Sequence, residues 1–186
     1  EFSKCKCMNT QSHKKMDIKT EIISTINDTD LADLCNITEQ AIKAGGGFGW
    51  LKVPPRGVLK KYWKGNAVVP NRKLIVGRLN KAIAGTLQLI FPPSNNEAQQ
   101  KNFSIVSHFV APWGRGFGLA KAMIDKAESI GLEYGTNCAL LDVRETQEAA
   151  IKLFESKGYS QWGINPYYAV VNGKNIKGYY YYKKLK

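Results

Sequence analysis

Residues 109–120 have the sequence Phe-Val-Ala-Pro-Trp-Gly-Arg-Gly-Phe-Gly-Leu-Ala, in which a glycine-rich turn joins a predicted strand to a predicted helix. The strand, Phe103–Ala111, is mostly apolar and is therefore expected in the interior of a sheet. Glycines let a ligand approach the backbone closely, and the first amides of a helix have no partners inside the helix. The turn is therefore a candidate site for a pyrophosphate group, with the positive charge of Arg115 beside it.

A glycine-rich turn is compatible with more than one role. It can also serve only to pack a helix onto a sheet. A triphosphate-binding loop would end in Gly-Lys-Ser or Gly-Lys-Thr, and no such ending is present. A dinucleotide fingerprint would order its glycines differently and pair them with an acid about 20 residues later that holds a ribose. The turn therefore indicates a phosphate site without naming the ligand.

The segments on both sides of the turn predict a mixed α/β domain over residues 18–186. The predicted strands are Ile18–Ile26, Lys73–Leu79, Ala82–Phe91, Phe103–Ala111, Cys138–Val143 and one or two strands around Asn172-Gly173 that close on Gly178–Lys183. The predicted helices are one from a cap at Thr29 or Asp30 to Gly45, a basic one over Gly57–Ala67, one after the glycine-rich turn, and one from a cap at Thr146 to Gly158. Tyr179–Tyr182 are expected to alternate between the two faces of a strand at the sheet edge. Residues 1–17 are expected to be a basic tail or a remnant of cloning.

The composition limits the function classes. No window approaches the roughly 18 to 20 apolar residues of a membrane-spanning helix, and the first 20 residues do not resemble a signal peptide. The formal net charge is +12, from 27 Lys and Arg against 15 Asp and Glu. Between Gln40 and Asn96 the chain has no acidic residue, which favours anionic partners and would repel polyamines. A basic nucleic-acid-binding module is therefore an alternative to an enzyme.

The four cysteines follow neither a disulfide pattern nor the ligand spacing of a metal site. They are Cys5, Cys7, Cys35 and Cys138, and only His13 and His108 could add imidazole ligands. We therefore expect no bound metal, and free thiols that suit a reducing cytoplasm. Cys138 lies within an apolar predicted strand, where nothing nearby in the sequence would activate its thiol.

Five residues around the turn have the identity and spacing of a known family motif. Val110, Pro112, Arg115, Gly118 and Ala120 follow the pattern Val-x-Pro-x-x-Arg/Gln-x-x-Gly-x-Gly/Ala. This pattern resembles the main motif of the GNAT superfamily of acyl-CoA-dependent N-acetyltransferases, and residues 141–159 resemble its second signature. The resemblance implies a GNAT-like fold, with a central, mostly antiparallel sheet that is splayed at a cofactor cleft and flanked by about four helices.

The resemblance also implies that acetyl-CoA is the co-substrate and lies where the strand ending at Ala111 splays from the strand Cys138–Val143. The backbone of Phe109 and Val110 would bind the acetyl and pantetheine portions, and an N–H near Val110 would stabilise the oxyanion. The amides of Arg115–Ala120 would hold the pyrophosphate. The residues implied at the cofactor are Phe109, Val110, Arg115, Gly116, Phe117, Gly118, Leu119, Ala120, Gln147 and Ala150.

Two positions differ from the family pattern. Gln147 stands where members commonly have Asn, and its amide offers the same chemistry to the pantetheine. Phe154 stands where members commonly have the Tyr that protonates the departing thiolate. The acid would then be water, Tyr159, Tyr167 or Tyr168, of which Tyr168 is our candidate catalytic residue. Phe154 also raises the alternative of a CoA-binding domain without catalysis.

The acceptor amine must lose a proton before it attacks, so a base is needed. His108, next to Phe109 on the strand, is the candidate catalytic base, and Glu97 in the preceding loop is a second candidate. A lone histidine in a buried strand can equally make a structural hydrogen bond.

The sequence thus predicts an enzyme that moves an acetyl group from acetyl-CoA to a primary amine of a small molecule or protein. We expect direct attack in a ternary complex rather than an acetyl-cysteine, because Cys138 lacks an activating neighbour. The acceptor wall is expected around Trp50, Tyr62 and Trp63, although core packing would account for these residues equally well. The acceptor is expected to be neutral or acidic. The expected location is cytoplasmic, without membrane or nucleic-acid partners, and a dimer is one open oligomeric state.

Overall fold

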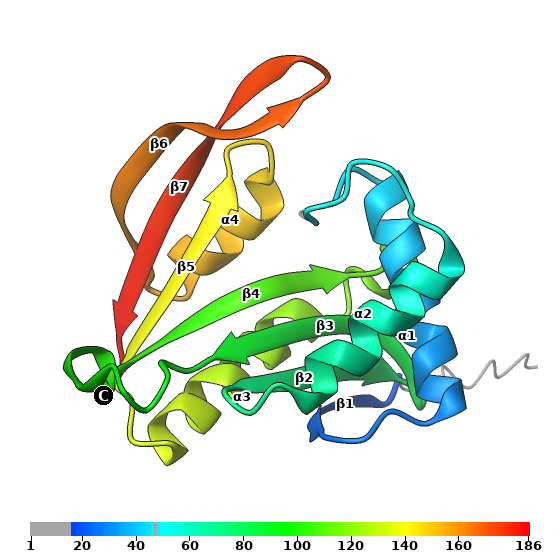
Figure 1. The fold of residues 1–186 in the computed structure, drawn as a ribbon, viewed down its shortest axis with the longest axis horizontal. Coiled ribbons are helices and arrows are strands. Elements are labelled where there is room, and N and C mark those ends of the chain that lie inside the picture. The colour runs from blue at the N-terminus through cyan, green and yellow to red at the C-terminus, as the bar shows by residue number, and fades with distance from the viewer. Residues whose placement is uncertain (1–15, 47) are drawn as a thin grey trace, which may run out of the picture.

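The computed structural model describes residues 16–46 and 48–186 (Figure 1). Within these residues a seven-stranded sheet is accompanied by four α-helices and two short 3-10 helices. The strands are β1 (Ile18–Ile23), β2 (Arg72–Leu79), β3 (Ala82–Ile90), β4 (Asn102–Val110), β5 (Cys138–Arg144), β6 (Ser160–Val171) and β7 (Lys174–Lys184). The helices are α1 (Asp28–Lys43), α2 (Arg56–Val68), η1 (Glu97–Gln99), η2 (Pro112–Gly114), α3 (Leu119–Glu133) and α4 (Glu148–Ser156). The predicted mixed α/β class is confirmed.

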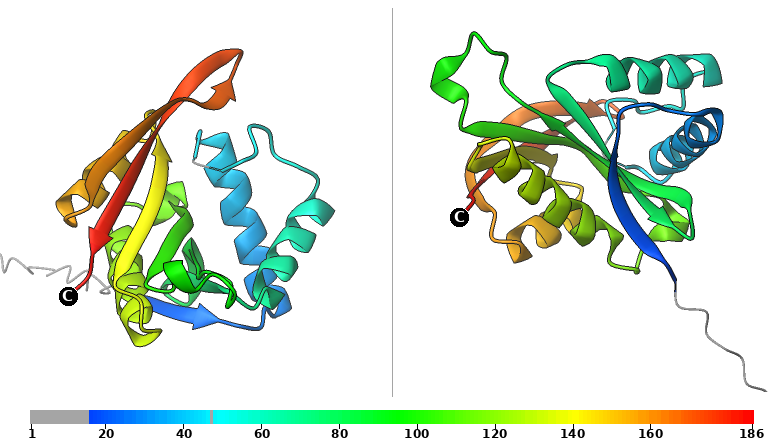
Figure 2. Two further views of the ribbon diagram at one scale, coloured as in Figure 1. Left: turned by 60° about the vertical axis from the view of Figure 1, so that its left-hand side comes forward. Right: turned by 90° about the horizontal axis from the view of Figure 1, so that it is seen from below.

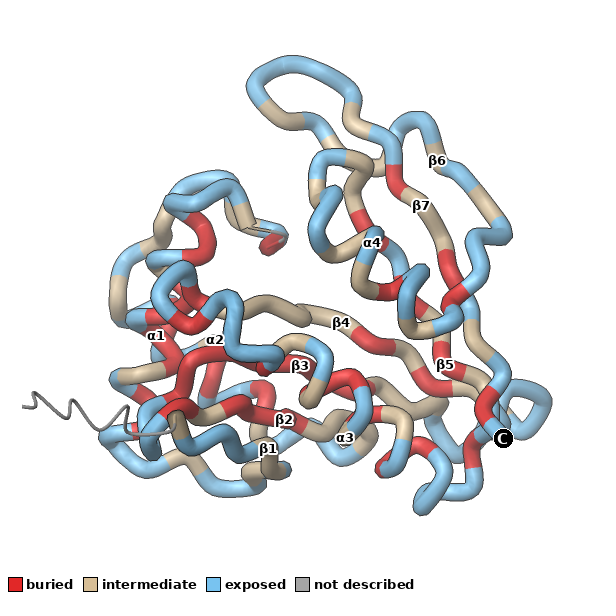
Figure 3. The backbone as a smooth tube through the Cα atoms, turned by 180° about the vertical axis from the view of Figure 1, so that it is seen from behind, coloured by how far each residue is buried: buried red, intermediate tan, exposed pale blue. Residues whose placement is uncertain are grey.

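The sheet has an apolar core on each face. Its strand order is β1-β2-β3-β4-β5-β7-β6, and neighbouring strands are antiparallel except for β4 and β5. α1 and α2 cover one face with side chains such as Leu34 and Trp63, and α3 and α4 cover the other with Met123 and Phe154 (Figure 2). Buried residues follow the central strands β2 and β3, whereas most of β6 is exposed or half-buried (Figure 3). The helices thus leave two sides from which ligands can approach the splayed half of the sheet.

β4 and β5 separate soon after they begin, and this separation opens the sheet. Among the described residues, they pair in parallel only between Asn102–Ser104 and Cys138–Leu140. Farther along, β4 stays with β3, β5 stays with β7, and the two halves diverge as a V (Figure 1). The backbone edges that face each other across the V can therefore bond to a ligand. The predicted splay is confirmed.

A β-bulge in β4 decides which helices its side chains contact. The register with β3 shifts so that Ser107 and His108 together lie opposite Leu87, and Ser107 has a positive φ of 50°. One extra residue reverses the alternation of side chains along a strand. His108 consequently lies on the face covered by α3 and α4, where it contacts Phe154, whereas Phe109 packs on the face covered by α1 and α2.

The structure corrects the predicted start of α1. The helix begins at Asp28, and its N-cap is Asn27 rather than Thr29 or Asp30. The Asn27 Oδ1 accepts a hydrogen bond from the Asp30 amide at 2.8 Å. Asn is among the preferred N-cap residues because its short side chain reaches an unpaired amide in the first turn. Asp28 and Asp30 then lie in that first turn, where negative charge is favourable.

The predicted cap of α4 is also wrong. The N-cap residue is Gln147 rather than Thr146, and no side-chain hydrogen bond caps this helix. The reason is a tight turn after β5, in which the Gln147 amide donates to the Arg144 carbonyl at 2.9 Å and delays the helix by one residue. The Gln147 side chain is thereby left to reach across the cleft.

Residues 16 and 17, at the end of the expected tail, contact the domain that is predicted to begin at residue 18. Residues 1–15 of the expected tail, with Cys5, Cys7 and His13, lie outside the described residues. Met16 packs against the core. The Asp17 amide donates to the side-chain Oδ1 of Asn80 in the β2–β3 turn, and the Asn80 amide donates to the Asp17 carbonyl, both at 3.0 Å. β1 ends at Ile23, so the last predicted residues of this strand, up to Ile26, lie in the connection to α1.

The tyrosines of β7 alternate as predicted, but the strand is not an edge strand. Tyr181 is wholly buried and Tyr179 packs on the same core, whereas Tyr180 and Tyr182 lie on the opposite face. β7 pairs with both β5 and β6, which makes β6 the edge. The misplacement arises because β6 and β7 swap order relative to the chain, a long-range pairing that a local pattern does not encode.

Gly131 in α3 is a close-packing position, and the Gly131→Ala variant should be less stable than the parent. A Cβ at this position would lie 2.3 Å from the Phe103 ring in the core, so the substitution should lower the free energy of unfolding by about 1–3 kcal/mol. Gly65→Ala in α2 is the control, because no atom lies within 4 Å of its added Cβ, and it should raise stability by about 0.5–1 kcal/mol. Chemical denaturation measures both, and a change of the same sign in both variants would contradict the prediction.

Candidate active site

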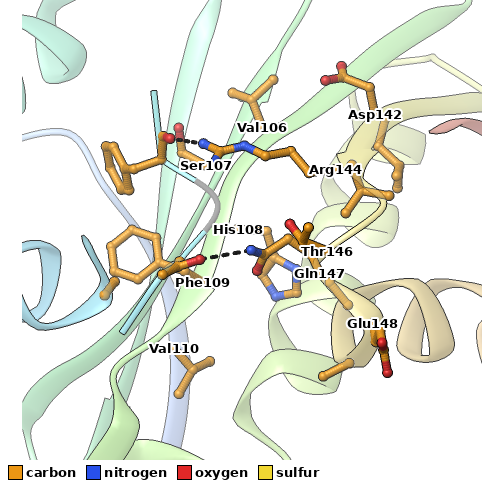
Figure 4. Close-up of a pocket in the computed structure, with 18 of the residues that line it drawn as sticks. Val106, Ser107, His108, Phe109, Val110, Asp142, Arg144, Thr146, Gln147 and Glu148 are labelled. Carbon is orange, nitrogen blue, oxygen red and sulfur yellow. Dashed lines mark hydrogen bonds between the residues drawn. The ribbon is translucent and has the colours of Figure 1, made fainter. Parts of the chain in front are cut away.

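A cleft of about 960 Å³ occupies the V between β4 and β5 (Figure 4). Its walls include Val106–Val110 of β4 and Leu141–Arg144 of β5. On one face of the sheet it is lined by the segment after α1, including Gly45 and Phe48. On the other face it is lined by Arg115 and by residues of α3 and α4. Because helices from both faces contribute, the cleft is accessible to two ligands that approach from opposite sides of the sheet.

The start of α3 has the features of an anion site. Gly116 and Gly118 have positive φ values of 84° and 79°, and an added Cβ at either position would meet no atom within 4 Å. The N-cap residue is Gly118, and no side chain caps the helix. The first amides of α3 are therefore available to a ligand, and the helix dipole adds positive potential there. These features, with the exposed cation Arg115 on the cleft wall, fit a pyrophosphate.

Other residues of this turn contribute in different ways. The Phe117 side chain is 41% exposed, whereas the Leu119 side chain is 1% exposed and belongs to the core. Leu119 can therefore offer a ligand only its backbone amide. Ala120 lines the cleft, as does Ala150 on α4. Small side chains at both positions leave room for a ligand between the helices.

The end of β4 presents backbone to the cleft while its side chains are anchored in the two cores. The Phe109 ring packs edge-on against Phe48, with 5.1 Å between ring centroids. Val110 packs against the core on the opposite face. Both residues line the cleft. This edge can therefore offer peptide groups to an extended ligand without losing its own packing.

Two hydrogen bonds cross the mouth of the cleft. The Gln147 Nε2 donates to the Gly45 carbonyl at 2.9 Å, and the Arg144 Nη2 donates to the Phe48 carbonyl (Figure 4). Both connect the end of β5 to the segment after α1. Because the bond to Gly45 uses one N–H of the Gln147 Nε2, the Oε1 and the second N–H of the side chain are left for a ligand in the cleft.

His108 lies in an apolar environment between β4, α3 and α4. Its ring packs edge-on against Phe154, with 5.6 Å between centroids, and its Nε2 is buried with no hydrogen-bond partner among the described residues. Burial lowers the pKa of His108 to about 4, partly offset by a backbone group of Ala120. The imidazole is therefore neutral at pH 7, which lets it accept a proton but makes it a weak base.

The low pKa of His108 predicts a pH-dependent stability. An unfolded histidine has a pKa near about 6.5, so below that pH the unfolded chain takes up a proton that the folded chain does not. The contribution of the neutral His108 to the free energy of unfolding is thus fully present above about pH 6.5, and it is lost as the pH falls toward 4. Between pH 7 and pH 4.5, the loss at this residue should be about 2–3 kcal/mol. Denaturation of the parent and of His108→Gln at both pH values measures it, since carboxylates contribute equally to both; equal losses would contradict the prediction.

Tyr168 on β6 lines the cleft, and its hydroxyl donates a hydrogen bond to Asp142 on β5. Burial raises the pKa of Tyr168, and the hydrogen bond to Asp142 raises it further. Asp142 was not a predicted site residue. The sequence of β5 could have indicated it, because apolar and polar residues alternate along this strand. Leu141 and Val143 are buried, and Asp142 between them is exposed. The alternation places a carboxylate on the other face of the strand, but its partner on β6 depends on strand pairing.

Three further candidates lie away from the cleft. Tyr159 is 4% exposed and belongs to the core, and its burial raises the pKa of the phenol. Tyr167 is 76% exposed and does not line the cleft. Glu97 lies in η1, in the β3–β4 connection, at the closed end of the V (Figure 1). None of these three side chains is placed to exchange a proton with a ligand in the cleft.

The aromatic residues predicted as an acceptor wall support that wall from behind. Trp63 is wholly buried, and its indole N–H donates to Thr38 Oγ1 at 3.1 Å. Tyr62 and Trp50 pack against Phe48, with ring centroids 5.8 Å and 5.6 Å away. Among these aromatic residues it is Phe48 that lines the cleft. The core alternative therefore holds for Trp63, and Tyr62 and Trp50 position Phe48.

Within the described residues, the cleft contains neither a reactive cysteine nor a group of side chains that could bind a metal ion. Cys35 is buried and Cys138 is half-buried, and burial raises the pKa of both thiols. Neither lines the cleft. In the described ranges, no three His, Cys, Asp or Glu side chains are grouped closely enough to hold a metal ion. No helix in these ranges is both long and apolar enough to cross a membrane.

Comparisons with known sequences agree with this geometry. Residues 47–159 match the model of the acetyltransferase (GNAT) family. An uncharacterized N-acetyltransferase of Azospirillum brasilense, encoded in the hisH-hisA intergenic region, is 47% identical over 131 residues. The match covers 70% of this chain and 78% of that protein.

Solved structures share the fold at low identity. An N-acetyltransferase from Staphylococcus aureus has a TM-score of 0.77 and 18% identity, with 91% of this chain and 99% of that chain covered. A Salmonella typhimurium protein solved with its cofactor acetyl-CoA has a TM-score of 0.73 and 14% identity, with 91% and 94% covered. At these identities the two structures confirm the fold and leave the acceptor open.

Proposed function

This chain belongs to the acetyltransferase (GNAT) family and is an acyltransferase that uses acetyl-CoA, and from this premise we propose that it acetylates a primary amine by direct attack in a ternary complex. The observation that carries the proposal is a cleft lined from both faces of the sheet. Members of the family act on amine acceptors. An amine that enters beside the segment after α1 would meet the acetyl group between β4 and β5. The acceptor can be a small molecule or a protein.

The residues at the α3 end of the cleft fit the co-substrate. The uncapped amides after Gly116, together with Arg115, would bind the pyrophosphate. The free edge of β4 at Phe109 and Val110 would bind the pantetheine chain, with the Gln147 Oε1 opposite. Acetyl-CoA would supply an activated acetyl thioester. A backbone N–H near Val110 would stabilise negative charge that develops on the carbonyl oxygen.

The thiol positions favour direct attack over an acetyl-cysteine. A nucleophilic cysteine needs a lowered pKa and access to the reacting group. Burial has the opposite effect on the pKa of Cys138, and this residue lies outside the cleft lining. Cys35 lies on the buried face of α1, and burial likewise raises the pKa of its thiol. Direct transfer of the acetyl group between two bound substrates does not need a nucleophilic cysteine, so the positions of the two thiols favour this mechanism.

His108 and Tyr168 remain the predicted residues for proton transfer, and their surroundings refine their roles. The neutral His108 imidazole can accept a proton but, with a pKa near 4, would pass it on to water. The Tyr168 hydroxyl is engaged with Asp142, and its raised pKa makes it a weak acid toward a thiolate. We therefore assign protonation of the thiolate to water. Tyr168 would orient Asp142, whose carboxylate attracts the ammonium form of the acceptor.

Calorimetric titration with acetyl-CoA, with ATP and NAD as controls, tests the site. Initial rates of thiol release, with amine and acetyl-CoA both varied, then test the mechanism. Intersecting double-reciprocal lines are expected, and Cys138→Ser should retain activity. Absence of acetyl-CoA binding to folded protein would overturn the proposal. Parallel lines with an inactive Cys138→Ser variant would replace direct attack by an acetyl-cysteine.

A further inference from the structure

We propose that Arg144 binds a carboxylate of the acceptor, so that the preferred acceptors are amines that carry a carboxylate. The inference rests on the proposed function and adds the class of its acceptor. It starts from the position of Arg144 on the cleft wall, two residues after Asp142 on the same strand.

The alternation of β5 directs both charged side chains to one side. Leu141 and Val143 are buried in the core beneath α3 and α4. Asp142 and Arg144 therefore project from the other face of the strand. The bonds that they make agree with this direction, since Asp142 receives the Tyr168 hydroxyl and Arg144 reaches the Phe48 carbonyl. This is the face opposite to the start of α3, where the pyrophosphate would bind.

Arg144 has donors to spare. It is half-buried, and its hydrogen bond within the described chain is the one from Nη2 to the Phe48 carbonyl. Within residues 16–46 and 48–186, no carboxylate lies within the 4.0 Å of an ion pair with Arg144. By contrast, Arg78 pairs with both Glu21 and Asp30. A guanidinium has five N–H donors, and a partly desolvated one gains most from a planar, bidentate anion such as a carboxylate.

The neighbouring groups complete a site for a molecule of mixed charge. Residues two apart on a strand lie about 7 Å from each other, so Asp142 and Arg144 can hold an ammonium and a carboxylate of one small molecule. In Figure 4, Asp142 and Arg144 lie on the same side of the cleft, and Arg144 extends toward β4. In the segment 45–51, after α1, the residues that line the cleft are Gly45, Gly46, Phe48, Gly49 and Leu51, and none of them is an acidic residue that would repel a carboxylate.

The first test compares acceptors on the parent enzyme. Each standard L-amino acid is paired with its carboxamide, the C-terminally amidated dipeptide Ala-Asp-NH2 is paired with Ala-Asn-NH2, and a simple alkylamine serves as a reference. The expected result is a kcat/KM about 10-fold or more higher for the acid of a productive pair. The α-amine of an amide is the less basic of the two, so a preference for the acid cannot come from a larger share of uncharged amine. A preference within the amino acids indicates a small molecule, and a preference within the dipeptides indicates a peptide.

The second test uses the productive pair on Arg144→Gln. The ratio of kcat/KM for the acid to kcat/KM for the amide should fall about 10- to 100-fold, mainly through the KM of the acid. Arg56→Gln is the control, because this arginine pairs with Glu39 on the helical side and should leave the acid-to-amide ratio as in the parent. Binding of acetyl-CoA by each variant verifies that the fold is intact.

The outcomes separate the inference from the function on which it rests. Equal turnover of acids and amides by the parent, or turnover of the alkylamine alone, would overturn the role of Arg144 and leave acetyl transfer standing. An equal fall for acid and amide in Arg144→Gln would assign this side chain only to holding the Phe48 segment. Lack of turnover with every amine, in protein that binds acetyl-CoA, would instead overturn the proposed function.

Discussion

Arg115→Glu is expected to weaken acetyl-CoA binding by about 30- to 100-fold at low ionic strength. The substitution replaces an attraction by a repulsion at the uncapped start of α3, where backbone amides and the helix dipole already favour an anion. Arg115 is exposed, so the change should not affect the core. The dissociation constant from calorimetric titration, measured at two salt concentrations, gives the effect. The difference between variant and parent should shrink at high salt.

Lys152→Glu is the matched control for this change of charge. Lys152 is exposed on α4, and it does not line the cleft. It alters the net charge of the protein by the same amount as Arg115→Glu but places the carboxylate away from the glycine-rich turn. Its dissociation constant should stay near that of the parent. An equal weakening by both variants would show that net charge, rather than the site at α3, determines acetyl-CoA affinity.

Gly178→Ala is expected to lower kcat/KM for the acceptor by about 100-fold while leaving acetyl-CoA affinity unchanged. A Cβ at Gly178 would lie 2.2 Å from Cγ of Tyr168, so the phenol ring has to move. Its hydrogen bond to Asp142 would then be lost, together with the position of that carboxylate beside the acceptor. A misplacement of about 1 Å among groups that orient a substrate can cost this much in rate. Steady-state rates at saturating acetyl-CoA measure the effect.

Gly163→Ala on the paired strand controls for the loss of a glycine in this part of the sheet. Its added Cβ would lie 3.8 Å from Cβ of Tyr180, which is an ordinary contact. This variant should keep the activity of the parent. If Gly178→Ala were as active as Gly163→Ala, the position of Tyr168 would have no part in the reaction. Thermal denaturation of both variants checks that the sheet remains folded.

Local signals were sufficient for most of the fold and for the glycine-rich turn before α3. The strand, the glycine turn and the helix that follows depend on residues that are close in sequence, and they occur where predicted. Gly116 and Gly118 have positive φ angles, which glycine adopts without strain. The local sequence was therefore sufficient to predict the turn. The start of α1 was predicted less accurately, because Asn27, Thr29 and Asp30 are close together and each is a residue type that commonly caps a helix.

The other half of the site depends on contacts between distant parts of the chain. Asp142 meets Tyr168 across 26 residues, Arg144 meets Phe48 across 96, and Gln147 meets Gly45 across 102. The contact of Asp142 with Tyr168 requires the order of β5, β7 and β6, and the other two contacts require the end of β5 to lie near the segment after α1. No local period specifies either feature. The contact of Asp142 with Tyr168, and the positions of Trp50, Tyr62 and Trp63 behind Phe48 rather than in the cleft lining, have this common origin.

The sequence by itself determined the mixed α/β class and the glycine-rich start of a helix, because turn chemistry, strand alternation and helix periodicity are short-range properties. The family was indicated by the resemblance of two of its motifs to those of the GNAT superfamily. Only the tertiary structure decided that the Ser107 bulge turns His108 toward an apolar layer and lowers its pKa. Only the tertiary structure likewise brought Asp142, Arg144 and Tyr168 together on the wall of the cleft. The physical reason is that burial and charge pairing are set by whichever side chains meet after strands pair, and the pairing of β5 with β7 and of β7 with β6 brings together residues that are distant along the chain.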